Sequence, residues 1–221
     1  MGIKENLTKI KEQIGSNKVK IIAVTKYANW QQTLEAYNLG IRDFGESYVQ
    51  DAIEKLSRKL QNENSKNLIQ WHLIGRLQKN KAKYVVGKFF LIHSVDSVEL
   101  AEIINKIANS KGLTQNILLQ VNISQEAQKA GFNKDELKSS LKTLLNLPNI
   151  NIQGLMTLAP KTEDKKTIKD CFLGLHSLRD ELNKENICNL KELSMGMSND
   201  YLTAIECGST MVRIGRAIFS N

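Results

Sequence analysis

Short apolar runs rich in β-branched residues alternate with segments in which apolar residues recur every three or four positions. This alternation constrains the fold more than any other feature of the sequence. The first pattern is typical of buried strands and the second of amphipathic helices. Eight segments fit the strand pattern, and a helical segment follows each. The predicted strands are residues 19–25, 41–44, 69–74, 89–93, 116–121, 150–156, 190–193 and 211–214.

Eight strand–helix units predict a single closed (β/α)₈ barrel. Strands separated by helices pair in parallel through right-handed crossovers, and eight such units close into a TIM-type barrel. A doubly wound open sheet is the alternative, but its first strand is normally followed by a Gly-rich turn. Residues 25–30 contain no glycine. We therefore expect residues 1–221 to form one α/β domain, with an extra N-terminal helix over residues 3–14.

Capping residues mark several of the expected helix boundaries. Gly40 can adopt the left-handed conformation that ends a helix over residues 30–39. Ser97 and Asn133 precede helical segments and are good N-caps. Two further helices are expected over residues 48–60 and 79–86.

Composition argues against several classes of protein. The net charge of +8 favours binding to nucleic acid or another polyanion. However, the lysines alternate with Glu, Asp and Asn on helix faces, and aromatic residues make up only 6% of the chain. We expect no specific nucleic-acid partner. No apolar run approaches the roughly 18–20 residues that span a bilayer, and the N-terminal segment is charged. A cytoplasmic protein without a membrane partner is expected.

Cysteine and histidine positions predict neither disulfides nor a metal site. Cys171, Cys188 and Cys207 are an odd number at wide spacings, and Cys171 lies on an apolar helical stripe as a buried thiol would. The three histidines lie far apart and lack metal-ligand spacing.

Polar residues and glycines gather at the carboxyl ends of the predicted strands, where a barrel of this kind has its active site. Lys26 directly follows the first strand. A solvated lysine is the ordinary interpretation, whereas an amine at the barrel mouth would attack a carbonyl group. Arg213 would either form an ion pair, for example with Glu206, or hydrogen-bond a cofactor ring. His72 and His93 are interpreted as hydrogen-bonded parts of the fold.

The last two strand ends predict a phosphate site. Ser194 to Ser198 offer two hydroxyl groups around a glycine, and Gly215 begins a short helix. Backbone N–H groups at a helix N-terminus reached through a glycine bind phosphate, and barrels commonly place this site after strands seven and eight. Tight loops that merely require Gly and Ser are the alternative.

At these residues the sequence resembles the pyridoxal phosphate homeostasis protein family. The matching stretches run in order along almost the whole chain and are jointly very specific. They include Ala23-Val24-Thr25-Lys26, Phe44-Gly45-Glu46-Ser47, Trp71-His72-Leu73-Ile74-Gly75, His93-Ser94-Val95-Asp96, Lys129-Ala130-Gly131-Phe132, Gly154-Leu155-Met156 and Val212-Arg213-Ile214-Gly215.

The resemblance implies an alanine-racemase-like barrel that holds pyridoxal 5'-phosphate (PLP) as a Schiff base on Lys26. It places phosphate contacts at Ser194, Gly215 and Arg216, with Ser198 nearby, and sets Arg213 against the pyridine nitrogen. Three further residues at strand ends complete the expected cofactor contacts: Ser47, His72 and Met195. Ser47 departs from the family, which usually has Asn there, so one ring contact is open. Whether Lys129 reaches the cofactor is also open.

The resemblance further implies a protein that buffers or carries PLP, without catalytic turnover. An arginine at the pyridine nitrogen disfavours its protonation, which makes the ring a weak electron sink. The alternative is a PLP-dependent amino-acid racemase, which would need a second base beside the cofactor. Alanine racemases supply that base from an additional C-terminal domain, which we do not expect here. PLP, and apo forms of PLP-dependent enzymes, are the expected partners, and a monomer is expected.

Overall fold

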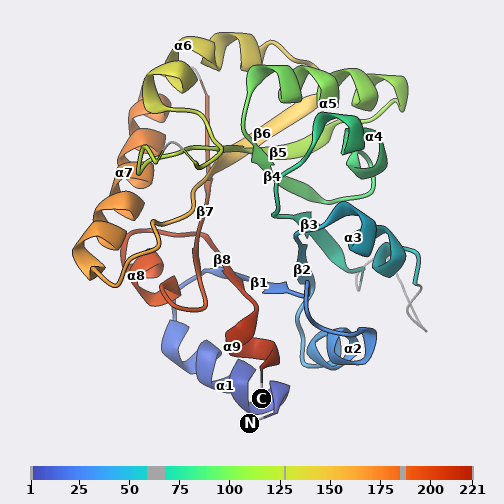
Figure 1. Cartoon of the computed structure of the whole chain (residues 1–221), viewed down its shortest axis with the longest axis vertical. Helices are drawn as coiled ribbons and strands as arrows, with labels where there is room; N and C mark the ends of the chain where they lie inside the picture. Colours follow the sequence, from blue (N-terminus) through green and yellow to red (C-terminus); the bar gives the residue numbers. More distant parts are fainter. Residues whose placement is uncertain (1, 59–67, 127, 185–187, 221) are drawn as a thin grey trace.

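A computed structural model describes residues 2–58, 68–126, 128–184 and 188–220 of the protein. Eight parallel strands form a closed barrel in which each strand pairs with its neighbours in sequence and β1 pairs with β8, as predicted (Figure 1). The strands are β1 (Lys20–Val24), β2 (Asp43–Glu46), β3 (Gln70–Leu73), β4 (Leu91–Val95), β5 (Gln115–Gln120), β6 (Ile150–Met156), β7 (Glu192–Met197) and β8 (Met211–Ile214).

Helices surround the barrel and connect its strands (Figure 1). The extra N-terminal helix α1 is present, and its Asn6 donates a hydrogen bond to the carbonyl of Ile218 at 3.0 Å. The two ends of the chain therefore lie side by side in Figure 1. The helices are α1 (Ile3–Ile14), α2 (Trp30–Asn38), α3 (Val49–Leu56), 3-10 helix η1 (Lys79–Lys81), α4 (Ala82–Val85), α5 (Val98–Ser110), α6 (Lys134–Leu145), α7 (Lys165–Lys184), α8 (Tyr201–Glu206) and α9 (Arg216–Phe219).

The expected helix caps are confirmed. The side chain of Ser97 accepts from the backbone N–H of Leu100 at 3.3 Å, and that of Asn133 accepts from Glu136 at 2.8 Å. Gly40 has φ +96°, which an L-residue rarely adopts, and it ends α2. Each cap satisfies backbone groups that a helix end leaves unpaired.

Two apolar clusters fill the molecule. The larger packs the helices against the outside of the barrel. The smaller is built from strand residues and fills the barrel interior: Ile22, Leu91, Leu118, Met156 and Met211. Burial of these side chains provides the main driving force for closure of the barrel. Polar side chains occupy the rest of the interior, as described below.

Three strands run further toward the barrel mouth than the sequence predicted. Strand β7 was expected to end at Leu193 but extends to Met197; β2 and β4 likewise each end two residues later than predicted. The added residues include glycine, serine and glutamate, which have low strand propensity, yet they are buried and paired with neighbouring strands. Tertiary pairing thus overrides local propensity at the functional end of the barrel.

Two predicted helices also differ. Residues 79–86 form a turn of 3-10 helix followed by a single α-helical turn, and the helix expected over residues 48–60 ends at Leu56. The predicted end of that helix lies outside the described residues. Cys171 and Cys207 are buried thiols, as expected for Cys171. Within the described part of the chain, no helix is both long and apolar enough to cross a membrane.

Candidate functional site

A cavity of about 1030 Å³ opens at the carboxyl ends of the strands. Lys26 and Ser47 line it from the β1 and β2 sides, and residues after β7 and β8 line the opposite side. Six of the nine predicted site residues lie around it: Lys26, Ser47, Ser198, Arg213, Gly215 and Arg216. The mouth cavity is therefore the place where the predicted site residues meet.

Lys26 lies in a turn directly after β1 and is exposed to the cavity. The turn is anchored by the preceding residue: the Thr25 hydroxyl donates to Glu46 at 2.5 Å, and Lys55 donates to the Thr25 carbonyl at 2.5 Å. Lys55 also pairs with the fully buried carboxylate of Glu46 at 2.7 Å. The Lys26 Nζ lies 4.7 Å from the centre of the Tyr27 ring. The backbone of Lys26 is thus held, while its side chain lies exposed at the cavity.

Arg213 forms part of the cavity floor and is almost completely buried. Among the described residues, its guanidinium donates to Ser194 Oγ at 2.7 Å and to the carbonyl of Thr157 at 3.0 Å. Burial lowers the pKa of Arg213 to about 10, and the charge of Asp200 opposes this shift. Arg213 is therefore still charged at neutral pH. The ion pair with Glu206 is not formed, so that interpretation was wrong.

Ser198 and Gly215 lie together at the start of α9. The Ser198 hydroxyl accepts from the backbone N–H of Ala217 at 3.3 Å. A Cβ added at Gly215 would lie 3.2 Å from the carbonyl oxygen of Val24, so a side chain there would press on β1. Ser198 thus caps the start of α9 beside Gly215, on the wall of the mouth cavity.

The other three predicted residues do not line the mouth cavity. Ser194 and His72 are fully buried in the barrel interior, and Met195 packs into the larger apolar cluster outside it. The cause is the longer β7: Ser194 and Met195 lie within the strand, where successive side chains point to opposite faces. Direct contact of these three residues with a ligand stays a prediction.

Ser194 and His72 belong to a line of hydrogen bonds inside the barrel. Ser194 Oγ lies 2.8 Å from His93 Nδ1, His93 Nε2 lies 2.9 Å from His72 Nδ1, and His72 Nε2 lies 2.9 Å from Asp43 Oδ1. Burial lowers the pKa of both histidines, and that of His93 strongly. Both imidazoles are therefore neutral at pH 7, which fits their interpretation as elements of the fold.

The residues on one side of the mouth cavity were not predicted from the sequence. Residues 158–163, which follow β6, line it together with Tyr27, Ile168 and Asp200. Residues 158–163 could have been predicted only from their position directly after a strand, because every segment that follows a strand reaches the mouth of the barrel. No residue pattern within the segment distinguishes it from an ordinary loop.

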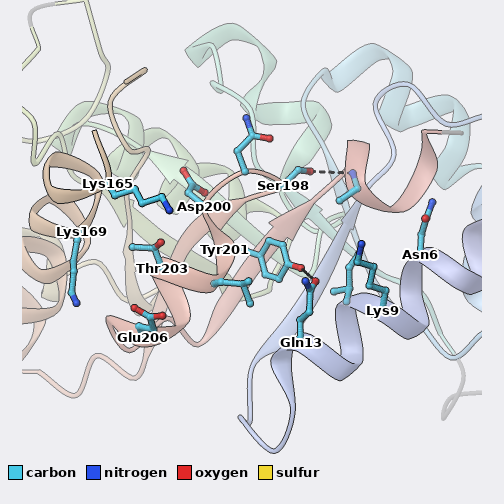
Figure 2. A pocket seen from close by; sticks show the side chains of 14 residues that line it. Asn6, Lys9, Gln13, Lys165, Lys169, Ser198, Asp200, Tyr201, Thr203 and Glu206 are labelled. Atoms are coloured by element: carbon cyan, nitrogen blue, oxygen red, sulfur yellow. Dashed lines mark hydrogen bonds between the residues drawn. The ribbon is translucent and has the colours of Figure 1, made fainter. Parts of the chain in front are cut away.

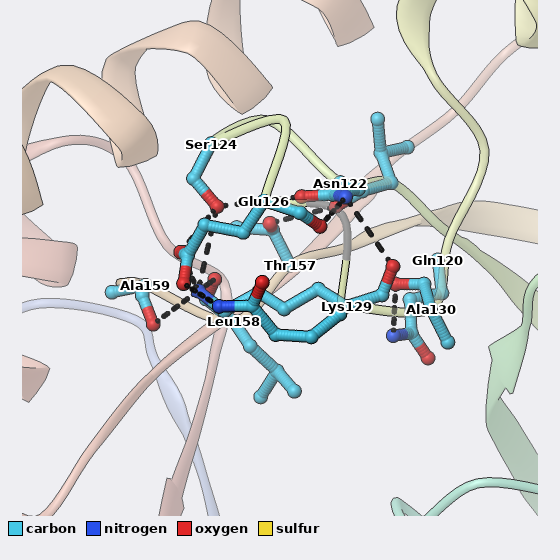
Figure 3. Close-up of polar contacts among 11 residues, drawn as sticks. Gln120, Asn122, Ser124, Glu126, Lys129, Ala130, Thr157, Leu158 and Ala159 are labelled. Atoms are coloured by element: carbon cyan, nitrogen blue, oxygen red, sulfur yellow. Dashed lines mark hydrogen bonds and ion pairs between the residues drawn. The ribbon is translucent and has the colours of Figure 1, made fainter. Parts of the chain in front are cut away.

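Lys129, in the loop after β5, donates to carbonyl groups of the segment after β6 that lines the mouth cavity (Figure 3). Its ammonium pairs with Glu126 at 2.5 Å and donates to the carbonyl of Ala159 at 3.0 Å. The hydrogen bond from Lys129 lowers the pKa of Glu126. Lys129 also lines a smaller cavity of about 250 Å³ on that side. In this arrangement Lys129 fastens the loop after β5 to the segment after β6.

A second hollow, of about 640 Å³, lies between α1, α7 and α8 (Figure 2). It shares Ser198, Asn199 and Asp200 with the mouth cavity. Lys9, Lys165 and Lys169 make it partly basic, whereas Asp200 and Glu206 add acidic groups. The mixed charge identifies no particular ligand. No group of three or more His, Cys, Asp or Glu side chains among the described residues could hold a metal ion.

The sequence profile of the alanine racemase N-terminal domain matches residues 2–221, which defines the class of this barrel. The pyridoxal phosphate homeostasis protein of Aquifex aeolicus is 39% identical over 97% of this chain and 96% of its own length. That of Pasteurella multocida is 37% identical over 99% of this chain and 97% of its own length. The chain therefore belongs to the pyridoxal phosphate homeostasis protein family, as the sequence indicated.

Solved structures agree with this assignment. PipY of Synechococcus elongatus, described as having PLP bound, superposes with a TM-score of 0.89 at 36% identity, over 99% of this chain and all of that one. Alanine racemase of Clostridium difficile superposes with a TM-score of 0.81 at 17% identity, over all of this chain but 56% of the racemase. The second likeness establishes the shared barrel fold alone.

Proposed function

We propose that the protein binds PLP in the mouth cavity as a Schiff base on Lys26 and acts in the cell as a carrier or buffer of PLP. The observation that carries this proposal is the convergence on one cavity of an accessible lysine, a buried arginine and a glycine-led helix terminus. The lysine would provide an amine for the aldehyde of PLP, the arginine a charged donor for its ring, and the helix terminus N–H groups for its phosphate. The solved PipY structure with PLP bound supports the choice of ligand.

The charges of the cavity fit this ligand. Arg213 lies in the floor. Within the described residues, Ser194 and Thr157 take two of its five N–H groups, so that another N–H can be given to the ring nitrogen of the ligand. Arg216 lines the wall next to Ser198 and Gly215, where a dianionic phosphate would lie. When bound, PLP supplies an aldehyde for amine capture and a ring that withdraws electrons.

The position of Arg213 supports a role without turnover. A charged arginine at the pyridine nitrogen keeps that nitrogen unprotonated, and such a ring stabilises a carbanion poorly. A racemase would also need a second base facing Lys26. Of the acidic groups on the cavity wall, Asp200 accepts a hydrogen bond from the backbone of Met197 at 2.5 Å, and Glu163 is exposed. The names of the homeostasis relatives support the same role.

Transfer of PLP to another protein would indicate a carrier, whereas turnover of amino acids would indicate a racemase. Protein loaded with PLP and freed of excess ligand is mixed with an apo aminotransferase, and recovery of aminotransferase activity is followed. Recovery supports a carrier or buffer, whereas permanent retention of PLP contradicts it. In parallel, single enantiomers of amino acids are incubated with the loaded protein and analysed by chiral chromatography. Racemisation above that of a Lys26→Ala control would favour the enzyme.

A further inference from the structure

Five side chains form a continuous hydrogen-bonded line through the barrel interior, from the amino end of β2 to the mouth cavity. We call this line the interior network; its members are Asp43, His72, His93, Ser194 and Arg213. Each of its four contacts is between 2.7 and 2.9 Å. His72, His93 and Ser194 have no exposed surface. Water therefore does not compete for these hydrogen bonds.

The two ends of the interior network fix the direction of every hydrogen bond in it. An arginine can only donate, and an ionised carboxylate can only accept. Asp43 accepts the Nε2 proton of His72, and in neutral rings this leaves Nδ1 of each histidine as an acceptor. Ser194 accepts from Arg213 and therefore gives its own proton to His93 Nδ1. The Nε2 proton of His93 then goes to His72 Nδ1, and the Nε2 proton of His72 goes to Asp43. The reverse order would set a His72 lone pair against the carboxylate.

Both imidazoles must be neutral for this order to hold. The charges nearest His72 are Asp43 and Glu192, which favour protonation, and Lys20, which opposes it. His93 faces His72, Arg213 and Lys20, all of which oppose protonation. Burial is the largest cause of the lowered pKa in both rings. Each ring is thus held in one neutral tautomer, with the proton on Nε2.

We propose that the interior network positions Arg213 for its ligand: its four other members hold the guanidinium in one orientation in the cavity floor. This inference rests on the proposed function, in which the ligand is PLP and its ring nitrogen meets Arg213. An arginine side chain loses rotamer entropy when a ligand fixes it, and a side chain ordered in advance loses less on binding. His72, His93 and Asp43 act through Arg213 and are positioning residues.

Histidine tautomers test the network directly, without ligand. The chain has three histidines, so long-range ¹H–¹⁵N spectra of ¹⁵N-histidine-labelled protein are readily assigned. We expect His72 and His93 as neutral Nε2–H tautomers at pH 7. His176 is the internal control: its Nδ1 lies 2.7 Å from the Cys207 carbonyl and donates to it, whether or not its Nε2, 3.2 Å from Asp180 Oδ2, is also protonated. An imidazolium or an Nδ1–H tautomer at His72 or His93 would overturn the proposal.

A double-mutant cycle tests whether the network acts through Arg213. PLP affinity is measured by absorbance titration for His93→Phe in the native and the Arg213→Ala backgrounds. His93→Phe removes buried hydrogen bonds that connect to the charged Arg213. We therefore expect it to weaken PLP binding about tenfold in the native background but less than about twofold in the Arg213→Ala background. Equal losses in both backgrounds would mean general loosening of the barrel and would refute the proposal. Leu118→Met, in the apolar interior, is the matched control and should leave affinity unchanged.

Asp43→Asn is a milder variant, because the side chain at this partly exposed end of the network keeps the same shape. An amide can donate as well as accept, so His72 is no longer fixed in one tautomer. We expect mixed His72 tautomers and PLP binding weakened severalfold; an unchanged His72 tautomer and unchanged affinity would contradict the proposal. If the native protein binds no PLP, the proposed function fails, whereas native binding without coupling in the cycle refutes only the network.

Discussion

Acidification from pH 7 to pH 5 should destabilise the protein through its two buried histidines. Each pKa is lowered in the folded state, chiefly by burial, from an ordinary value of 6.5. Below pH 6.5 the unfolded chain therefore binds protons that the folded protein does not, and stability falls as pH falls. A histidine that stays neutral in the folded state costs about 2 kcal/mol over this interval.

The expected loss lies between about 2 kcal/mol, from His93 alone, and about 4 kcal/mol if His72 contributes fully. His72 contributes less than His93 to the extent that Asp43 opposes its shift. The pKa values of Glu126 and Asp164 are lowered in the folded protein, so these carboxylates stop contributing to the free energy of unfolding only below this pH window. The free energy of unfolding should therefore depend on histidine protonation between pH 7 and 5.

Urea denaturation followed by circular dichroism at pH 5, 6 and 7 measures this dependence. In His93→Phe the loss between pH 7 and 5 should be smaller by about 2 kcal/mol, because that histidine no longer titrates in the unfolded chain. A free energy of unfolding that is constant or rises on acidification would show that the two histidines do not stay neutral in the folded protein. An undiminished loss in His93→Phe would show that other groups cause it.

Three substitutions test other parts of the account. Lys26→Ala should abolish covalent attachment of PLP with an unchanged circular dichroism spectrum, because the exposed side chain contributes little to the core; loss of folding would contradict the assignment. Arg213→Ala should weaken PLP binding roughly tenfold to a hundredfold, as expected for a hydrogen bond to a charged group, and shift the absorption of the bound ligand; no change in either would leave Arg213 only a structural role. Gly154→Ala should destabilise the barrel by about 1–3 kcal/mol or more, because its Cβ would lie 1.9 Å from the Glu192 carbonyl oxygen; a melting temperature equal to that of the native protein would contradict this.

The architecture could be predicted from sequence because the alternation of strand and helix patterns is strong throughout the chain. The segments of β6 and β8 have the predicted bounds, and every other predicted strand is present with shifted ends. The shifts concentrate in β2, β4 and β7, whose added residues include Gly45, Glu46, Ser94, Ser194 and Gly196. Local patterns indicate loops at these residues, whereas pairing with neighbouring strands makes them part of the barrel wall.

The candidate site was predicted in part for the same reason. Lys26 and Gly215 directly follow strands whose ends were placed within two residues, and both line the cavity. Ser194 was assigned to a loop because β7 was ended too early, and the structure places it inside the barrel beside His93. The contact between His72 and His93 joins residues 21 positions apart on neighbouring strands, which no local pattern reveals.

Attachment of PLP to Lys26 is best measured from the absorbance spectrum of the purified protein incubated with PLP, recorded before and after borohydride reduction. We expect a visible band that reduction removes, with a phosphopyridoxyl group on Lys26 in peptide mass maps. Absence of a band after incubation with excess PLP, or reduction products at other lysines only, would contradict it.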